Sequence, residues 1–166
     1  MIDYRDKYKV YLGLAIGIIL VPVLVIWLWN IFSGEEGRIR KFIQQGKKAV
    51  ESKNMFSCAD LVSMGYQDKY GNDRQGFIFA AKEVFDYYRQ ISVDIKSMEI
   101  KLNDSKTQAD LEMRVSLSGW VQDKLEKILE GENERIRLRL FKEDKKWHLL
   151  ELEFHGPVMI MEQNIN

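Results

Sequence analysis

Tyrosine and aspartate side chains gather in one stretch of the sequence, where they could perform acid–base chemistry. This stretch and the helix expected after it include the candidates Tyr66, Asp68, Tyr70, Asp73, Tyr87 and Tyr88. A carboxylate beside a tyrosine hydroxyl can act as base and acid in one pocket. Alternatively, Tyr66 packs in the core while Asp68 and Asp73 accept hydrogen bonds from amides of a turn and a helix start. The folding role is the favoured interpretation, and Tyr66 and Asp68 are kept as catalytic candidates.

The histidines and the cysteine limit other kinds of chemistry. His148 and His155 fall on one expected strand with a spacing that points them to opposite faces, so only His148 is kept as a candidate base. The single thiol, Cys58, excludes an intramolecular disulfide and favours a buried, inert side chain. One cysteine and two histidines do not make a compact metal site, and no glycine-rich phosphate loop is present. Neither a metal nor a cofactor is expected.

The charge of the chain is balanced, with 25 basic and 25 acidic side chains. This balance provides no general attraction to nucleic acid, and no nucleic-acid partner is expected. Arg135, Arg137 and Arg139 alternate along one expected strand and could bind an anion or an acidic partner. Because Asp110 and Glu112 alternate on a neighbouring strand, mutual neutralisation across the sheet is the favoured interpretation.

Three helices are expected to position these residues. A stripe of apolar side chains predicts a helix over residues 35–52. A shorter helix covers residues 55–63, with Asn54 available as its N-cap. A third helix follows with Asn72 or Asp73 as its N-cap, and its apolar spacing continues to Ile91.

The second half of the chain alternates between apolar and polar residues. Period-two runs over residues 93–102, 107–118, 135–140 and 147–154 predict a four-stranded antiparallel sheet. In the last run, the residues expected on one face are Leu150, Leu152 and Phe154. Residues 121–129 form either a short amphipathic helix or the tip of a long hairpin. The sheet has one apolar and one charged face, and the helices are expected to cover the apolar face, which gives an α+β fold.

Three motifs in this order resemble a known superfamily. They are the opening helix that ends in Lys48-Ala-Val50, the junction Tyr66-Gln-Asp-Lys-Tyr-Gly71, and a closing hairpin in which a charged turn precedes Trp147 and an apolar strand. Over residues 35–155 the chain resembles the nuclear transport factor 2-like (SnoaL-like, cystatin-like) superfamily. The resemblance implies three helices on a curved sheet that encloses a conical pocket, for which four aromatic lining residues are expected: Tyr66, Phe85, Tyr88 and Trp147. Members include isomerases, dehydratases, ligand binders and scaffolds, so the fold alone does not decide function.

An uncharged segment precedes this domain. Residues 11–32 would span about 33 Å as a helix, which matches the hydrocarbon core of a bilayer. Tyrosines flank one end and tryptophans the other, as at membrane interfaces, whereas a cleaved signal peptide has a shorter apolar core. Pro22 is tolerated in a membrane helix. Gly13 and Gly17 could pack two helices into a homodimer. We expect a single transmembrane helix, with a short tail, residues 1–10, on the inner side.

The expected organisation is that of a bitopic protein, with the soluble domain on the outer, periplasmic side of a bacterial inner membrane. Residues 156–166 form a C-terminal tail whose apolar start either extends the last strand or docks on a partner. We expect a non-catalytic interaction or scaffold domain that is held at the membrane with a protein partner. The alternative is a membrane-tethered small-molecule binder or an isomerase- or dehydratase-like enzyme that uses the pocket.

Overall fold

The computed structural model describes residues 34–128 and 135–154. The predicted transmembrane segment, residues 11–32, with its glycine pair, and the C-terminal tail lie outside these ranges. Within them, no helix is both long and apolar enough to cross a membrane.

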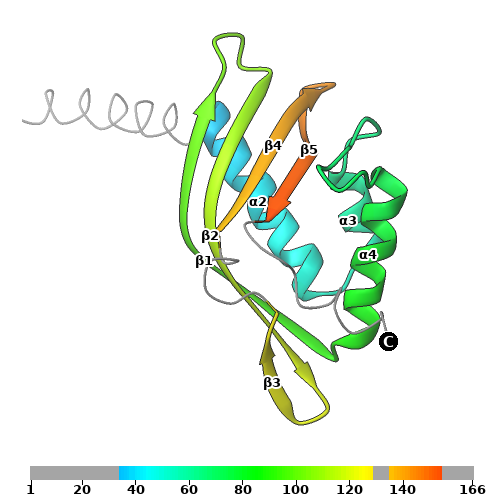
Figure 1. Cartoon of the computed structure of the whole chain (residues 1–166). Helices are drawn as coiled ribbons and strands as arrows, with labels where there is room; N and C mark the ends of the chain where they lie inside the picture. Colours follow the sequence, from blue (N-terminus) through cyan, green and yellow to red (C-terminus); the bar gives the residue numbers. More distant parts are fainter. Residues whose placement is uncertain (1–33, 129–134, 155–166) are drawn as a thin grey trace, which may run out of the picture. The chain divides into compact units, whose positions relative to one another are not determined.

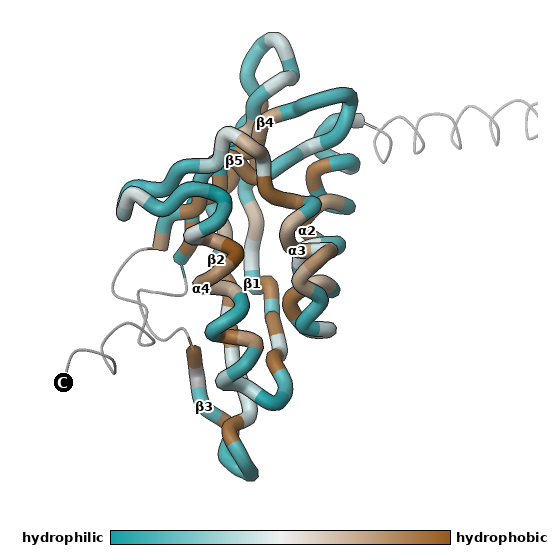
Figure 2. Tube along the Cα trace, turned by 90° about the vertical axis from the view of Figure 1, so that its right-hand side faces the viewer, coloured by the Kyte–Doolittle hydropathy of each residue, from teal (hydrophilic) through white to brown (hydrophobic). Residues whose placement is uncertain are grey.

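Three helices come first, as predicted (Figure 1). They are α2 (Glu35–Glu51), α3 (Met55–Leu61) and α4 (Arg74–Tyr87). The side chain of Asn54 accepts a hydrogen bond from the Ser57 amide at the start of α3, and Asp73 accepts one from the Gly76 amide at the start of α4. Both predicted N-caps are thus confirmed. In Figure 2 all three helices combine hydrophilic and hydrophobic segments, as expected of helices with one buried face.

The third helix is shorter than its apolar spacing suggested. It ends at Tyr87, and Tyr88 already has extended backbone angles. Ile91 lies in the following strand opposite Gly119, although the spacing from α4 is helical. Tyr88 and Ile91 are both buried in the same cluster as Phe85, so burial is preserved while the backbone changes from helix to strand.

In the described part of the chain the sheet contains five antiparallel strands, one more than predicted. They are β1 (Gln90–Leu102), β2 (Gln108–Val121), β3 (Lys124–Lys127), β4 (Arg135–Glu143) and β5 (Lys146–Phe154). Their order is β1-β2-β4-β5, and β3 pairs with the far end of β2. The hairpin alternative for residues 121–129 is therefore correct. A two-residue turn, in which Gln122 has a φ of 55°, lets Val121 pair with Lys124 and continues the ladder.

The predicted alternation in β2 and β4 is confirmed by burial. Four inward residues of β2 are at most 5% exposed, namely Ala109, Leu111, Met113 and Val115, whereas Leu117 on the same face is half-buried. On β4, Leu138 and Leu140 are buried, while Arg135, Arg137 and Arg139 lie on the other face. With Ile39, Phe42 and Ile43 of α2, the inner face forms the main hydrophobic cluster.

The prediction for β5 is wrong at Leu150. A bulge separates Leu149, which pairs with Leu140, from Glu151, which pairs with Arg139. The carbonyls of Leu149 and Leu150 both accept hydrogen bonds from the segment before α4, through the amides of Ser63 and Gln67. Because successive carbonyls of a regular strand point to opposite sides, this arrangement requires an extra residue. As a result, Leu149 and Leu152 pack on the core, not Leu150 and Leu152.

Candidate functional site

An apolar cavity of about 230 Å³ lies between α2, α3 and the inner face of the sheet. We call it the inner pocket. Its helical lining residues include Phe42, Ile43, Gly46, Lys47, Val50, Cys58 and Leu61, and its strand lining residues include Val93, Met113, Val115, Leu117, Ile136, Leu152 and Phe154. The exposed atoms of the lining are apolar. The inner pocket therefore suits an uncharged, apolar occupant.

The charged lining residue Lys47 directs its ammonium group at other partners. Its Nζ lies 2.9 Å from Oε1 of Glu51 and also donates a hydrogen bond to the Val93 carbonyl. The same Glu51 oxygen accepts a hydrogen bond of 3.0 Å from the Val93 amide. Burial would raise the pKa of Glu51, but the hydrogen bonds from Lys47 and Val93 and the Lys47 charge outweigh it and lower the pKa. The methylene chain of Lys47 is therefore the part that can line the pocket.

The one thiol of the chain also lines the inner pocket. Cys58 is 7% exposed, and burial raises the pKa of its thiol. A thiol held in its neutral form is a poor nucleophile and a poor metal ligand. Within residues 34–128 and 135–154, no cluster of three histidine, cysteine or carboxylate side chains could hold a metal ion.

Two sequence candidates for catalysis, Tyr66 and Asp68, do not line the inner pocket, although Tyr66 packs against one of its lining residues. Tyr66 is 3% exposed, and its ring centroid is 5.1 Å from that of Phe77, which does line the pocket. Burial, together with the nearby charges of Asp68 and Glu151 and a hydrogen bond with Asp68, raises the pKa of Tyr66. The phenol therefore stays protonated at neutral pH.

The carboxylate of Asp68 is occupied by a turn. Its Oδ1 accepts hydrogen bonds of 2.9 Å from the amides of Tyr70 and Asn72, and its Oδ2 accepts another from the Asn72 side chain. These are the contacts of the folding role described above. Asp68 therefore stabilises this turn, whether or not it has any further role.

The other expected pocket residues lie in two different places. Phe85 and Tyr88 are buried in a second cluster with Cys58, where Tyr88 packs edge-on against Tyr87. Trp147 belongs to the main cluster, with Nζ of Lys142 located 5.7 Å from its ring centroid. All four expected residues, Tyr66 included, are buried in these two clusters, and none of them is among the residues that line the inner pocket.

His148 lies outside this group. On β5 it is half-buried between Trp147 and Leu149, which are both buried, so its side chain points to the opposite face of the sheet. It pairs in register with Phe141 of β4. His155 lies outside the described residues.

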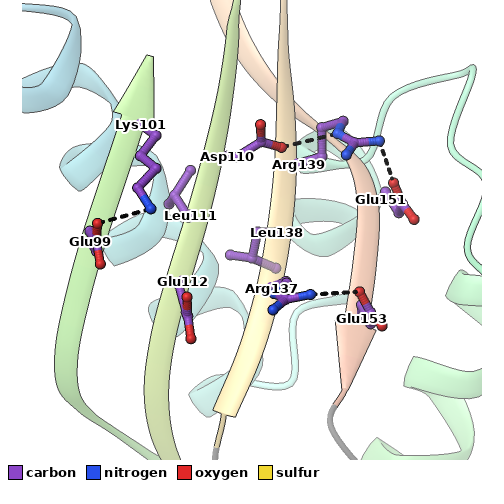
Figure 3. Close-up of a pocket in the computed structure, with 10 residues that line it drawn as sticks. All are labelled: Glu99, Lys101, Asp110, Leu111, Glu112, Arg137, Leu138, Arg139, Glu151 and Glu153. Atoms are coloured by element: carbon purple, nitrogen blue, oxygen red, sulfur yellow. Dashed lines mark hydrogen bonds and ion pairs between the residues drawn. The ribbon is translucent and has the colours of Figure 1, made fainter. Parts of the chain in front are cut away.

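The outer face of the sheet carries a second, polar depression of about 330 Å³, shown in Figure 3, which we call the charged groove. It is lined mainly by five carboxylates and three cations: Glu99, Asp110, Glu112, Glu151, Glu153, Lys101, Arg137 and Arg139. Arg139 bridges Asp110 at 3.0 Å and Glu151 at 2.9 Å, and Lys101 lies 3.1 Å from Glu99. The predicted neutralisation of Arg139 by Asp110 is therefore confirmed, and the cations of the groove already have partners within the sheet.

Sequence reasoning did not find the residues that line the inner pocket on α2 and α3. Gly46, Lys47 and Val50 are close in sequence, but Cys58, Leu117 and Phe154 join them only through tertiary packing. The one feature of the sequence that could have indicated the pocket was Gly46, a residue without a Cβ within an amphipathic helix. A Cβ at that position would lie 3.8 Å from Leu61, so the glycine is not required by close packing.

Proteins of known structure share this arrangement. One is a proposed scytalone dehydratase from Novosphingobium aromaticivorans, with 16% identity and a TM-score of 0.62 over 74% of this chain and 85% of that chain. Another is a Nostoc punctiforme protein of unknown function with a cystatin-like fold, with 11% identity and a TM-score of 0.55 over 75% and 94%. Bd1075 of Bdellovibrio bacteriovorus is 10% identical, with a TM-score of 0.57 over 72% of this chain, but the match spans only 39% of that protein's length.

No family model and no curated protein sequence matches the chain. At identities this low, structural likeness shows the fold alone. On that basis, the domain has the conical α+β fold of the nuclear transport factor 2-like, SnoaL-like and cystatin-like proteins.

Proposed function

We propose that this protein is a membrane-tethered, non-catalytic binding protein that holds a small apolar molecule in the inner pocket. The observation that carries the proposal is the cavity of about 230 Å³ whose exposed lining atoms are apolar. Replacing water by an apolar molecule against such a lining lowers the free energy. A polar molecule would find no hydrogen-bond partners among these exposed atoms.

The volume limits the size of the ligand. A cavity of about 150 Å³ holds benzene, so by proportion 230 Å³ holds about nine non-hydrogen atoms. This is the size of a small aromatic or short aliphatic molecule. A sterol or a complete acyl chain would need the pocket to widen.

The chemistry of the lining supports a non-catalytic role. A general base must come within hydrogen-bonding reach of the proton that it removes. Among the described lining residues there is no carboxylate and no imidazole, and the ammonium of Lys47 is paired with Glu51. Asp68, the carboxylate of the isomerase- or dehydratase-like alternative, is held by the turn before α4.

The tether is the part of the proposal that depends on the sequence. Residues 11–32 have the length and composition of a bilayer-spanning helix. A domain held at a bilayer would sample apolar molecules that concentrate there. Carbonate washing of membranes tests this part alone, since an anchored protein stays in the membrane fraction.

Methyl NMR of the full-length protein in lipid nanodiscs tests ligand binding, with benzene as the probe. Met113 lines the inner pocket, whereas Met64 is 81% exposed and reports non-specific contact. We expect a saturable ring-current shift of the labelled Met113 methyl and no such shift for Met64. Equal, non-saturating shifts of both methyls would contradict the proposal.

A matched pair of variants ties the response to the cavity. Val50→Phe places a larger side chain at a lining position and should abolish the Met113 response. Val84→Phe makes the same change at a half-buried position of α4 outside the lining and should preserve the response. A response of Val50→Phe equal to that of the wild type would place the benzene elsewhere.

The interaction role predicted from the sequence needs an exposed surface instead. Trp120 and Leu125 face each other across β2 and β3 and are 40% and 56% exposed. A membrane crosslink to a protein partner that is lost on Trp120→Ser and kept on Phe56→Ser, where Phe56 is 88% exposed on α3, would favour that role.

A further inference from the structure

The last strand ends at the inner pocket, and an apolar stretch of sequence follows it at once. Phe154 is the final residue of β5 and lines the pocket. Residues 158–161 are Val, Met, Ile and Met, and we call them the tail segment. We propose that the tail segment docks in the inner pocket of its own chain and competes there with the apolar ligand. The competition, but not the docking, rests on the proposed function.

The register of the sheet limits how far β5 can continue against the described part of β4. Phe154 already pairs with Ile136, and β4 begins at Arg135. The described part of β4 therefore offers one further pairing position beyond Phe154. The tail segment lies further along the chain than that position, so none of its residues has a pairing position on the described part of β4.

The connection is long enough for docking. The positions of the tail segment lie four to seven residues beyond Phe154, which gives a reach of about 13–25 Å. A sphere with the volume of the inner pocket is only about 8 Å across. Gly156-Pro157 precedes the tail segment, and this dipeptide is typical of a change in chain direction.

The size and chemistry of the tail segment match the cavity. The inner pocket holds about nine non-hydrogen atoms, and one isoleucine and one methionine side chain supply about eight together. All four side chains of the tail segment are apolar, like the exposed lining. Methionine is flexible enough to fit an irregular cavity. Docking would thus fill the inner pocket with two side chains and leave the other two outside it.

Cys58 provides a direct test, because it is the only thiol of the chain and lines the inner pocket. Full-length Met159→Cys and Ile160→Cys variants are treated with a mild disulfide oxidant and followed by mass spectrometry. A disulfide requires Cα atoms about 4.4–6.8 Å apart, so it forms within the chain only if the tail segment enters the pocket. We expect at least about tenfold faster bonding to Cys58 from one of these positions than from the polar-tail control Asn164→Cys.

Two results of this experiment would overturn docking within the chain. One is equal rates at positions 159, 160 and 164, which would show that the tail is not directed at the pocket. The other is bonding only between two molecules, with a rate that rises with protein concentration, which would assign the tail segment to a second copy. Cys58→Ala in each background should abolish the product.

The benzene titration separates docking from ligand competition. In full-length Met159→Asp/Ile160→Asp, an emptied pocket should lower the half-saturating benzene concentration for the Met113 methyl at least about threefold, and Asn164→Asp should leave it unchanged. A tail that crosslinks to Cys58 while Met113 never responds to benzene would support docking and contradict the proposed function. A Met113 response that is the same with and without the charged tail, and no crosslink, would support the proposed function and overturn docking.

Discussion

Successive residues of β2 lie in two different environments. Leu111, on the inner face, is 2% exposed and pairs in register with Leu138 of β4. Asp110, one residue earlier, lies on the outer face, and its side chain is 67% exposed although it accepts a hydrogen bond from Arg139. One strand thus contributes to a buried apolar layer and to an open charged layer.

The two layers differ in what they contribute to the fold. Burying a leucine side chain stabilises a protein by about 1.5–3 kcal/mol, whereas an exposed ion pair contributes about 0–1 kcal/mol. The outer layer therefore favours strand alignment and solubility more than stability. The inner layer holds the fold together, and its cavity is a place where lining atoms lack packing partners.

The largest expected effect on the free energy of unfolding is in the main hydrophobic cluster of the inner face. Leu140 is fully buried between β2 and β5, so Leu140→Ala should lower the free energy of unfolding by about 3 kcal/mol. Leu125→Ala removes the same atoms from a side chain that is 56% exposed and should cost less than about 1 kcal/mol. Urea unfolding checks both, and equal losses would contradict the comparison.

A second inner-face prediction concerns close packing at Gly119. A Cβ at this position would overlap the ring of Tyr88, so Gly119→Ala should destabilise the domain by about 1–3 kcal/mol. Gly46→Ala is the matched control, because its Cβ meets Leu61 at an ordinary 3.8 Å within α2. Gly46→Ala should stabilise the domain by about 0.5–1 kcal/mol, because alanine has a higher helix propensity than glycine. Thermal unfolding distinguishes the two, and a neutral Gly119→Ala would disprove the tight contact.

Glu51, the last residue of α2, contacts the backbone of β1 and predicts a pH dependence. Its pKa is lowered in the folded state, so its contribution is complete above the unfolded pKa and is lost as pH falls through the folded pKa. Glu51→Gln should cost about 1 kcal/mol at pH 7, and this difference from the wild type should shrink as the pH falls below the ordinary glutamate pKa of about 4.3.

Urea unfolding between pH 3 and pH 7 measures this difference. Glu83→Gln, an exposed change on α4, serves as the control and should leave the pH profile close to that of the wild type. A difference between Glu51→Gln and the wild type that does not change with pH would show that Glu51 acts through shape, not charge.

The smallest effect is expected on the outer face. Arg139 bridges Asp110 and Glu151, but the Arg139 and Asp110 side chains are 51% and 67% exposed. A double-mutant cycle of Arg139→Ala and Asp110→Ala should give a coupling of about 0–1 kcal/mol that decreases with added salt. A coupling above about 2 kcal/mol, insensitive to salt, would mean that the charged groove is structurally as important as the core.

Local patterns predicted most of the fold. The N-caps Asn54 and Asp73 and the alternation along β2 depend on neighbours in sequence, and the structure confirms them. The bulge at Leu150 depends on hydrogen bonds from residues more than 80 positions earlier, so the sequence of β5 cannot signal it. The turn at Gln122 has a positive φ without glycine or asparagine, and the sequence therefore left helix and hairpin open.

The candidate site was less predictable than the fold. Tyr66 and Asp68 stood out because their side chains can do chemistry, yet a turn and a core explain their contacts. The inner pocket is instead made of ordinary apolar residues from α2, α3 and the sheet, and its volume depends on how they pack. No spacing rule reports a space left between helix and sheet.

The hydrogen bonds of Lys47 and Glu51 with the backbone of Val93 have a consequence for behaviour at high protein concentration. Val93 lies on β1, the outermost strand on that side of the sheet, and both its amide and its carbonyl are taken by these two side chains. A strand from a foreign chain that tried to add there would have to displace a charged pair first. These hydrogen bonds therefore disfavour edge-to-edge aggregation at β1. They come from side chains of α2, a helix that the domain needs for its core in any case.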